Sequence, residues 1–182
     1  MSNIFFGFLL IFFDFNFTIN EIFIIGLIPD FAGYILMVKG LDTLAHESFH
    51  FERIRPFAVG MGIYSGIIYA FDLFGLSSQI SFFGSVLGIV SAVISIYITY
   101  VIILGIREIE DNNTVDLKSK SLMTCLAIMA IFQVVVLFFS FIPISYGISI
   151  AFIIFSLLVN IVFLVCFNTS KNLYEQMPYD ND

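Results

Sequence analysis

The sequence predicts an all-α membrane protein, a polytopic helical bundle of about six transmembrane segments. Two observations lead to this fold class. The chain is 60% hydrophobic and only 12% charged, and its Lys and Arg residues fall into short clusters between long apolar blocks. A soluble domain is about one-quarter charged, because water must wet its surface. With so few charges and a mean hydropathy of +1.05, this chain requires a lipid bilayer as its solvent.

Four apolar blocks are long enough to cross a bilayer, which takes about 20 residues of helix. They cover residues 57–76, 79–106, 121–142 and 146–168. Apolar residues follow one another within them, without the strict alternation of a barrel strand, so helices are expected. The connections at 77–78 and 143–145 are short enough for tight hairpins. Pro56 is expected in the first turn of the first of these helices.

The N-terminal part of the chain allows two arrangements. Residues 4–13 form an apolar run too short to span comfortably, and Pro29 interrupts the longer stretch 22–41. In the first arrangement, 4–17 crosses the membrane and 22–41 returns as one proline-kinked helix. In the second, half-helices over about 4–13 and 29–41 form a re-entrant hairpin that the other spans cover, as irregular backbone in a membrane requires. We favour the first, which gives six crossings.

The positions of the cations predict the orientation of the chain. If each apolar block crosses the membrane, every Lys and Arg lies on the same side, a bias typical of cytoplasmic loops. We therefore expect a multi-pass cell-membrane protein with both termini in the cytoplasm. One membrane domain would cover 1–170, followed by a polar, acidic tail over 171–182. The cations are Lys39, Arg53, Arg55, Arg107, Lys118, Lys120 and Lys171.

Composition also limits the partners. The net charge is -7, with only 7 basic residues, which argues against nucleic acid, because neutralising phosphates takes clusters of Lys and Arg. Cys125 and Cys166 lie within apolar blocks and are expected to pack as small hydrophobic side chains. The expected partners are the lipid bilayer and either another membrane protein or further copies of this chain. No cofactor is expected, and the abundance of Phe and Ile with little Arg indicates a microbial source.

Small residues recur every four positions on two adjacent predicted helices. This spacing lets helix backbones approach closely inside a membrane. Because a hairpin joins the two helices, we expect their small-residue faces to pack against each other, with a homodimer seam as the alternative. The residues are Ala58, Gly62, Gly66 and Ala70 on the first helix and Gly84, Gly88 and Ala92 on the second.

The two histidines of the chain belong to an HExxH pattern, His46-Glu47-x-x-His50. Over these five residues the chain resembles the signature of zinc peptidases. The resemblance implies that His46 and His50 bind Zn²⁺ from one face of a helix and that Glu47 activates the metal-bound water. The alternative, which we favour, is an amphipathic extension of the preceding helix at the membrane surface, with Phe49 and Phe51 in the lipid.

Asp30, Gln133 and Asn160 fall near the middle of their predicted membrane segments, and Tyr64 and Ser65 lie at a similar depth. A carboxylate there costs roughly 2.5–3.5 kcal/mol, so it is expected to face the bundle and find partners. One interpretation is a path for a proton or cation, lined by the first three side chains. The other is that a Pro-Asp pair starts a helix, whose free N–H groups and positive dipole end stabilise the acid.

The function predicted first is that of a small integral membrane protein acting as a non-enzymatic subunit, accessory factor or regulator. The closely spaced small residues and the lack of recognisable nucleophile or phosphate-binding motifs favour it. The second hypothesis is a small transporter or channel that uses Asp30. The third is a membrane-embedded zinc peptidase that uses His46, Glu47 and His50.

Overall fold

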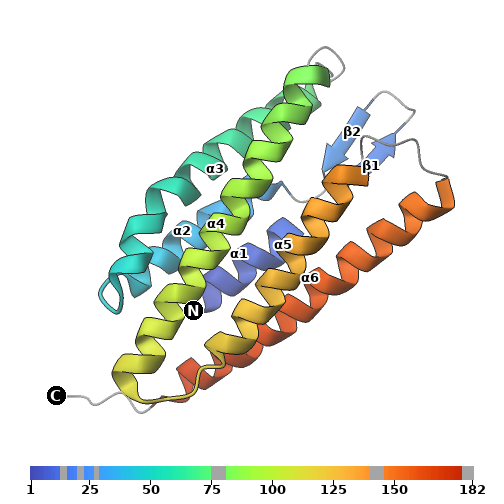
Figure 1. Ribbon diagram of the computed structural model, residues 1–182. Coiled ribbons are helices and arrows are strands. Elements are labelled where there is room, and N and C mark those ends of the chain that lie inside the picture. Colours follow the sequence, from blue (N-terminus) through green and yellow to red (C-terminus); the bar gives the residue numbers. More distant parts are fainter. Residues whose placement is uncertain (13–15, 20–22, 27–28, 75–80, 140–145, 178–182) are drawn as a thin grey trace.

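The computed structural model is a bundle of helices with one short β-hairpin, which confirms the helical membrane fold class (Figure 1). It describes residues 1–12, 16–19, 23–26, 29–74, 81–139 and 146–177. The connections predicted at 77–78 and 143–145 lie outside these residues. The helices are α1 (Ser2–Phe12), α2 (Asp30–Leu44), α3 (Phe49–Leu73), α4 (Ser81–Asn113), α5 (Ser119–Phe139) and α6 (Tyr146–Glu175). The strands are β1 (Asn16–Ile19) and β2 (Phe23–Gly26).

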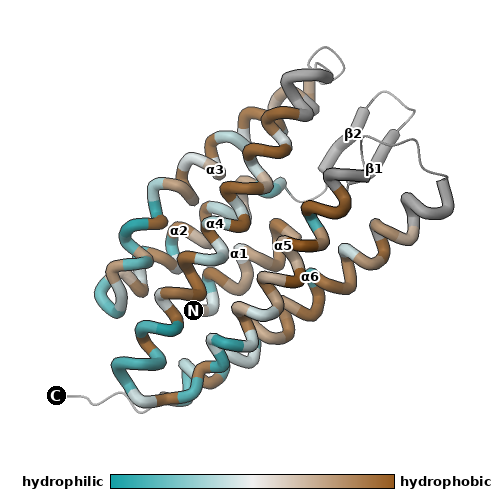
Figure 2. Tube along the Cα trace, in the orientation of Figure 1, coloured by the Kyte–Doolittle hydropathy of each residue, from teal (hydrophilic) through white to brown (hydrophobic). Residues whose placement is uncertain are grey.

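Four of the described helices, α3 to α6, are long and apolar enough to cross a membrane. Figure 2 shows them as mainly hydrophobic along their length and hydrophilic where they gather near the chain termini. The first two helices are shorter. The 11 residues of α1 rise about 16 Å, roughly half of a ~30 Å hydrocarbon layer. The first pair of segments is therefore short, as the fold class anticipates.

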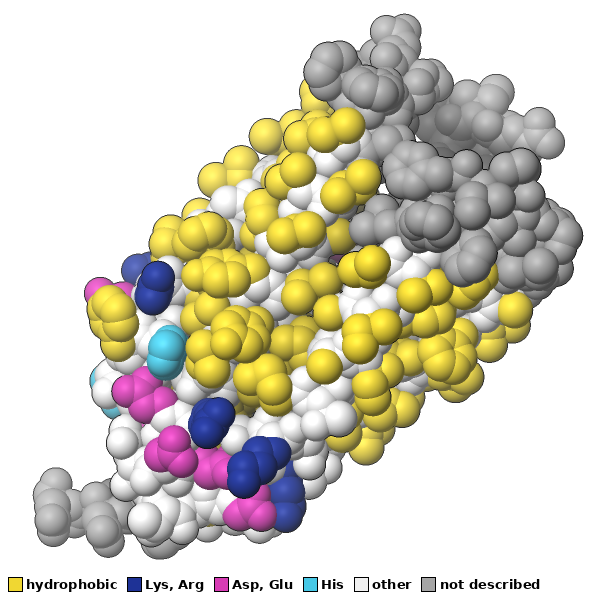
Figure 3. Space-filling model, in the orientation of Figure 1, with side chains coloured by type: hydrophobic (Ala, Val, Ile, Leu, Met, Phe, Trp, Pro, Cys, Tyr) yellow, Lys and Arg dark blue, Asp and Glu magenta, His cyan; other side chains and the backbone are white. Residues whose placement is uncertain are grey.

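The charged residues gather where the helix ends meet, and we call this end of the bundle the charged end (Figure 3). The N-terminus is part of it, because Ser2 donates a hydrogen bond of 2.6 Å to Glu175, the last residue of α6. The end of α2 and the start of α3 meet there as well, through an ion pair of 2.6 Å between Asp42 and Arg55. Successive helices therefore alternate in direction, with both ends of the described chain at the charged end.

The core lies in the half of the bundle next to the charged end. Ile102 of α4, Leu122 of α5 and Phe167 of α6 are fully buried there. Toward the opposite end, Val90 of α4 and Ile131 of α5 are 48% and 66% exposed. This difference matches the way α4 diverges from α5 and α6 in Figure 1. The long helices pack closely at the charged end and separate beyond it.

The short helices α1 and α2 pack antiparallel at very close range. A Cβ atom at Gly33 would lie 2.8 Å from the carbonyl oxygen of Gly7, and one at Gly40 would lie 2.8 Å from the backbone nitrogen of Ile4. Backbones approach this closely only where side chains are missing. On its other side, α1 places the ring of Phe8 edge-on against two rings of α6, at centroid distances of 5.3 and 5.2 Å.

The helix bounds in this region agree, to within a few residues, with the half-helices of the second predicted arrangement. The favoured arrangement, with one kinked helix over 22–41, is wrong in that element, because Phe23–Gly26 forms a strand. Asn16 lies opposite Gly26 in the antiparallel register of the hairpin. The helix begins only at Asp30, with Pro29 as its N-cap residue. Proline disfavours the helical conformation in the residue before it and suits the start of a helix, which explains the boundary.

The prediction that the small-residue faces of α3 and α4 pack against each other is also wrong. A Cβ atom at Gly62 would lie 3.3 Å from Cβ of Tyr34, and one at Gly66 would lie 3.8 Å from Cβ of Phe31, so this face of α3 meets α2. A Cβ atom at Gly88 of α4 would meet nothing within 4 Å. The four-residue spacing identifies helix faces that carry only small side chains. On α3 this face packs against α2 rather than against α4.

The remaining small residues of α3 and α4 have different surroundings on the two helices. Ala58 is fully buried and lines a shallow groove between α2 and α3, while Ala70 is half-buried. Ala92 faces a cavity described below. Gly84 belongs to the first turn of α4, where the surroundings of the side chains lie outside the described residues.

Two helix boundaries differ from the sequence expectation. The third helix begins at Phe49, so Pro56 lies within it rather than in its first turn. Proline leaves the carbonyl four residues earlier without its helical hydrogen bond, which water can replace beside exposed Glu52 and Arg53. The last helix continues to Glu175, past residue 171, and Tyr174 is buried.

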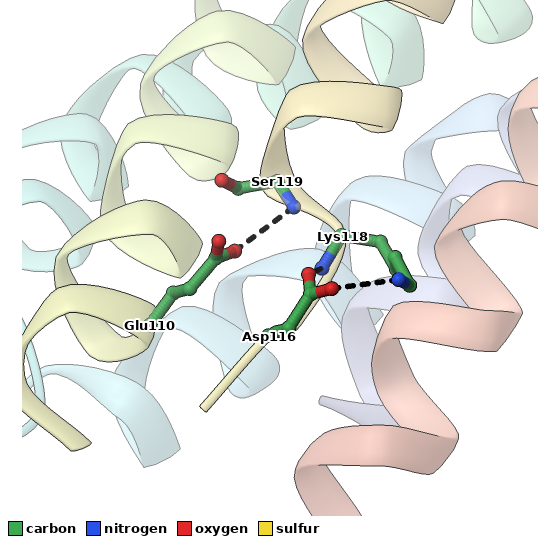
Figure 4. A network of polar contacts seen from close by, with 4 residues as sticks. All are labelled: Glu110, Asp116, Lys118 and Ser119. Carbon is green, nitrogen blue, oxygen red and sulfur yellow. Dashed lines mark hydrogen bonds and ion pairs between the residues drawn. The ribbon is translucent and has the colours of Figure 1, made fainter. Parts of the chain in front are cut away.

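The turn between α4 and α5 is held by a small polar network (Figure 4). The carboxylate of Glu110 accepts a hydrogen bond of 3.0 Å from the backbone N–H of Ser119, the first residue of α5. Asp116 accepts hydrogen bonds from the Nζ atom of Lys118 (2.6 Å) and from its backbone N–H (3.0 Å). The pKa of Asp116 is lowered, mainly by the hydrogen bond from the Lys118 side chain and to a smaller extent by the one from the Lys118 backbone N–H. This network ties the start of α5 to the end of α4.

The helices α5 and α6 lie side by side over much of their length. The free thiols of Cys125 and Cys166 face each other across this contact, with 3.4 Å between the sulfur atoms. Farther from the charged end, the rings of Phe132 and Phe155 lie 4.7 Å apart.

The contact between α1 and α2 predicts a position-dependent effect of adding one methyl group. Gly33→Ala places a Cβ atom against the Gly7 carbonyl and should destabilise the protein by about 1–3 kcal/mol through overpacking. Gly60→Ala on α3 is the matched control, because its Cβ would meet nothing within 4 Å. Alanine favours helix at both positions by about 1 kcal/mol. Thermal unfolding in detergent, followed by circular dichroism, measures the difference, and equal melting temperatures would contradict the close packing.

Candidate functional site

The structure brings Asp30, Gln133 and Asn160 to one cavity between the helices, where Asp30 and Asn160 are half-buried and Gln133 is exposed. The cavity has a volume of about 400 Å³ and also receives Tyr64 and Ser65 from α3. Three different helices supply the first three residues, so their similar depth along the chain becomes proximity in space. The volume lies in the range of small-molecule sites, about 300–1,000 Å³.

The local structure of α2 explains the position of Asp30. The helix begins at Asp30, directly after its N-cap residue Pro29, and this first residue lines the cavity. The Oδ1 atom of Asp30 is buried. The acid lies in the first turn of the helix, where the positive end of the helix dipole interacts favourably with negative charge. The two sequence interpretations are therefore compatible, since the residue that suits the helix start also lines the cavity.

The core separates the cavity from the charged end. Along α4, Ser91 and Ser95 line the cavity and buried Ile98 follows them toward the charged end. On α6 the same order holds, with Asn160 in the cavity and buried Phe163 next toward that end. The cavity thus lies in the half of the bundle where the long helices separate.

Serine and tyrosine hydroxyls line much of the cavity wall. The hydroxyls of Ser65 and Ser91 each donate to the backbone carbonyl three residues earlier, at 3.2 and 2.8 Å. The hydroxyls of Tyr34 and Ser95 share a hydrogen bond of 2.8 Å. A hydroxyl that donates its only proton to a backbone carbonyl still has lone pairs that can accept a hydrogen bond. These groups therefore present oxygen acceptors to whatever enters the cavity.

The electrostatics of the cavity are one-sided. Among the described residues that line it, Asp30 is the only carboxylate, and none is a Lys, Arg or His. Charges interact strongly in such an environment because the surrounding dielectric constant is low. The arrangement suits a cation, whose charge the carboxylate balances and whose hydration the hydroxyl and amide oxygens replace.

Tyr34, Ser91, Ser95 and Ser156 also line the cavity, and the sequence analysis missed them. A signal for two of them was present, since Ser91 and Ser95 are four residues apart and so share a helix face. That face also carries Gly88 and was interpreted as a packing face. No comparable signal marks Tyr34 or Ser156, whose neighbours become visible only in the folded bundle.

The HExxH pattern does not lie on one helix. The second helix ends at Leu44 and α3 begins at Phe49, so His46 and Glu47 lie in the turn between them and His50 in the first turn of α3. The shared helix face required for zinc binding is therefore missing. Within the residues that the structure describes, no group of three or more His, Cys, Asp or Glu side chains could hold a metal ion.

The residues of this pattern instead join helices at the charged end. Ser48 accepts a hydrogen bond of 3.1 Å from the backbone N–H of His50 and so caps α3. The Ser48 hydroxyl also donates to Glu108 of α4. Glu47 accepts a hydrogen bond of 3.2 Å from the hydroxyl of Tyr174 on α6. These contacts connect the turn between α2 and α3 to the ends of two other helices.

The favoured alternative, one amphipathic surface helix through this region, is wrong as well. The helix breaks between Leu44 and Phe49. Phe49 is 67% exposed, but Phe51 is fully buried rather than in the lipid. A Cβ atom at Gly105 of α4 would lie 2.6 Å from the Phe51 ring, so glycine makes room for it.

These contacts predict that Ser48 matters for stability and that His46 does not. Ser48→Ala removes the cap of α3 and should lower the free energy of unfolding by about 1 kcal/mol. His46→Ala should change it little, because this side chain is 71% exposed. Metal analysis of the purified protein should find no stoichiometric zinc. One zinc per chain, lost on His46→Ala, would restore the peptidase hypothesis.

Comparison of the chain with models of known protein families, with curated proteins and with solved structures found no match. The features that bear on function are therefore those of the cavity: its charge, its oxygen acceptors and its position beyond the core, where the long helices separate.

Proposed function

We propose that this protein is a small membrane transporter that binds a cation at Asp30. The observation that carries the proposal is that the cavity combines one carboxylate with several oxygen acceptors and, among the described lining residues, no cationic side chain. A carboxylate at membrane depth is costly, and such residues commonly mark ion or proton pathways.

The start of α2 supports a cation over an anion. A helix N-terminus attracts negative charge and often binds an anionic ligand, but here Asp30 already supplies that charge. A bound cation would interact with the carboxylate directly, and the positive end of the helix dipole favours negative charge at the same position. An anion would have to approach the same carboxylate without a Lys or Arg among the described residues of the wall.

The asymmetric packing supports a transporter over an open pore. The buried residues Ile98, Leu126 and Phe163 lie between the cavity and the charged end. A substrate at Asp30 would therefore reach the charged end only if this core rearranged. A binding site closed on one side is the arrangement expected of alternating access, in which helices rock around a central site.

Substitution of Asp30 tests the proposal. Asp30→Asn keeps the size of the side chain but removes its charge, so cation binding should weaken by about tenfold or more, as a loss of ~1.4 kcal/mol already produces. Flux of protons and of monovalent inorganic and organic cations into reconstituted vesicles, reported by trapped indicator dyes or by radiolabelled uptake, should fall by a similar factor at cation concentrations below saturation. Asp111→Asn is the matched control, because Asp111 is exposed at the charged end and away from the cavity.

Thermal unfolding of the same variants separates binding from folding. We expect Asp30→Asn to unfold close to the wild-type temperature. If it fails to insert or melts much earlier, the carboxylate serves to start α2 and the transport proposal loses its main support. Wild-type flux through well-folded Asp30→Asn would also contradict it. The interpretation as a non-enzymatic subunit stays a prediction, which co-purification of a larger complex after gentle extraction would favour.

We further propose that the protein is a multi-pass component of a microbial cell membrane with both termini and the charged end in the cytoplasm. The support is the bias of Lys and Arg toward one end of the bundle, as the positive-inside rule describes. Reporter tags fused after Arg55, Lys120 and Asp182 should all report the cytoplasm. Tags that report from opposite sides of the membrane would contradict this orientation.

A further inference from the structure

A second hollow lies directly beside the polar cavity, on the face of the α3–α4 pair. It is a groove of about 400 Å³ to which α3 contributes Gly60, Met61 and Tyr64, and α4 contributes Leu87, Val90 and Ser91. Met61, Tyr64 and Ser91 also line the cavity. The groove and the cavity are therefore separated by only one layer of side chains between α3 and α4.

Next to the groove, α3 and α4 do not fill the space between them, because glycines there have no side chain. Cβ atoms at Gly60 and at Gly88 would each meet nothing within 4 Å. Gly60 lies on the groove side and Gly88 on the cavity side. The two helices thus carry unfilled space on both sides of the dividing layer, and Met61, Tyr64 and Ser91 form the wall that the two hollows share.

The groove opens to the hydrocarbon layer rather than to water. Its wall is mainly apolar, and Leu87 and Val90 are 41% and 48% exposed in the part of α4 that crosses the membrane. Phe57, which also lines it, is 45% exposed. Lipid chains are the natural neighbours of such a surface. A molecule in this groove would therefore have come from the bilayer.

From these observations we propose that the substrate is an amphipathic organic cation, an ammonium compound with an apolar chain, that enters from the bilayer between α3 and α4. The headgroup occupies the polar cavity beside Asp30, and the chain occupies the groove. The inference rests on the proposed function and names its substrate class. Charge complementarity selects the headgroup, since Asp30 is the only carboxylate among the described lining residues.

Aromatic rings in the cavity suit the same ligand. Tyr34, Tyr64 and Phe132 line it, and an alkylated ammonium group is attracted to the faces of such rings. A small inorganic cation would need neither these rings nor an apolar groove next to the site. In the groove the chain of the ligand exchanges contacts with lipid for van der Waals contacts with apolar side chains, whereas its charged head gains attractive contacts with the acceptors around Asp30.

The test compares ligands that carry the headgroup with and without its chain. The full-length protein in lipid nanodiscs is titrated with dodecyltrimethylammonium and with tetramethylammonium, and empty nanodiscs give the background. We expect saturable binding of both, tighter for the long-chain compound. Asp30→Asn should weaken both by about tenfold or more, because both depend on the headgroup site.

Gly60→Leu tests the groove by filling it with a side chain. It should lower the ratio of dodecyltrimethylammonium to tetramethylammonium affinity by about tenfold, because part of the chain loses its place. Val165→Leu on α6, at a site that is 61% exposed and lines none of the hollows described above, is the matched control and should leave the ratio unchanged. Circular dichroism melting confirms that each variant is folded.

The outcomes distinguish this inference from the proposed function. Cation flux that depends on Asp30, without saturable binding of the long-chain compound, would overturn the substrate class and leave the transporter proposal intact. An unchanged affinity ratio in folded Gly60→Leu would overturn the route through the groove. If neither cation flux nor ligand binding depends on Asp30, the inference and the proposed function are both overturned.

Discussion

The start of α2 inside the bundle is the constraint on which the rest of the structure depends. The first turn of any helix has backbone N–H groups without helical partners and carries the positive end of the dipole. Because α2 begins at Asp30, this polar helix end lies among apolar helices. An acid in the first turn is the residue type that such an end stabilises. The same carboxylate then gives the cavity its charge, so one residue serves both the fold and the site.

Glycines on both sides hold α2 in this place. Gly33 and Gly40 bring it close to α1, and Gly62 and Gly66 of α3 accommodate its side chains on the other side. Once α2 occupies the small-residue face of α3, that face is not available to α4. The contact between α3 and α4 is then left open around Gly88. The polar cavity and the apolar groove are both consequences of this choice of partner.

Much of this arrangement follows from the sequence. The length of the apolar blocks predicts the four long helices, and the cation clusters predict that their ends meet on one side. The similar depth of Asp30, Gln133 and Asn160 along their helices suggested a shared location, and all three line the same cavity. Depth can be counted along a chain because a helix rises by a fixed distance per residue.

A one-dimensional pattern does not specify which helices pack together or where a helix is interrupted. A spacing of four small residues marks a face for close approach but does not name the helix that uses it, so α4 was expected where α2 lies. The HExxH spacing assumes a continuous helix, whereas Ser48 is a good N-cap residue at which a new helix begins. The strand pairing of Asn16 with Gly26 depends on contacts between segments that are each too short to be diagnostic.

The uneven packing of the long helices makes the surrounding lipid part of the structure. Near the charged end, side chains such as Ile102 and Phe167 fill the space between helices. Farther along, where Val90 and Ile131 are exposed, acyl chains must fill it instead. We therefore expect the separation of these helices to respond to membrane thickness and lateral pressure. The width of the site around Asp30 would then be set jointly by the polypeptide and by the composition of its bilayer.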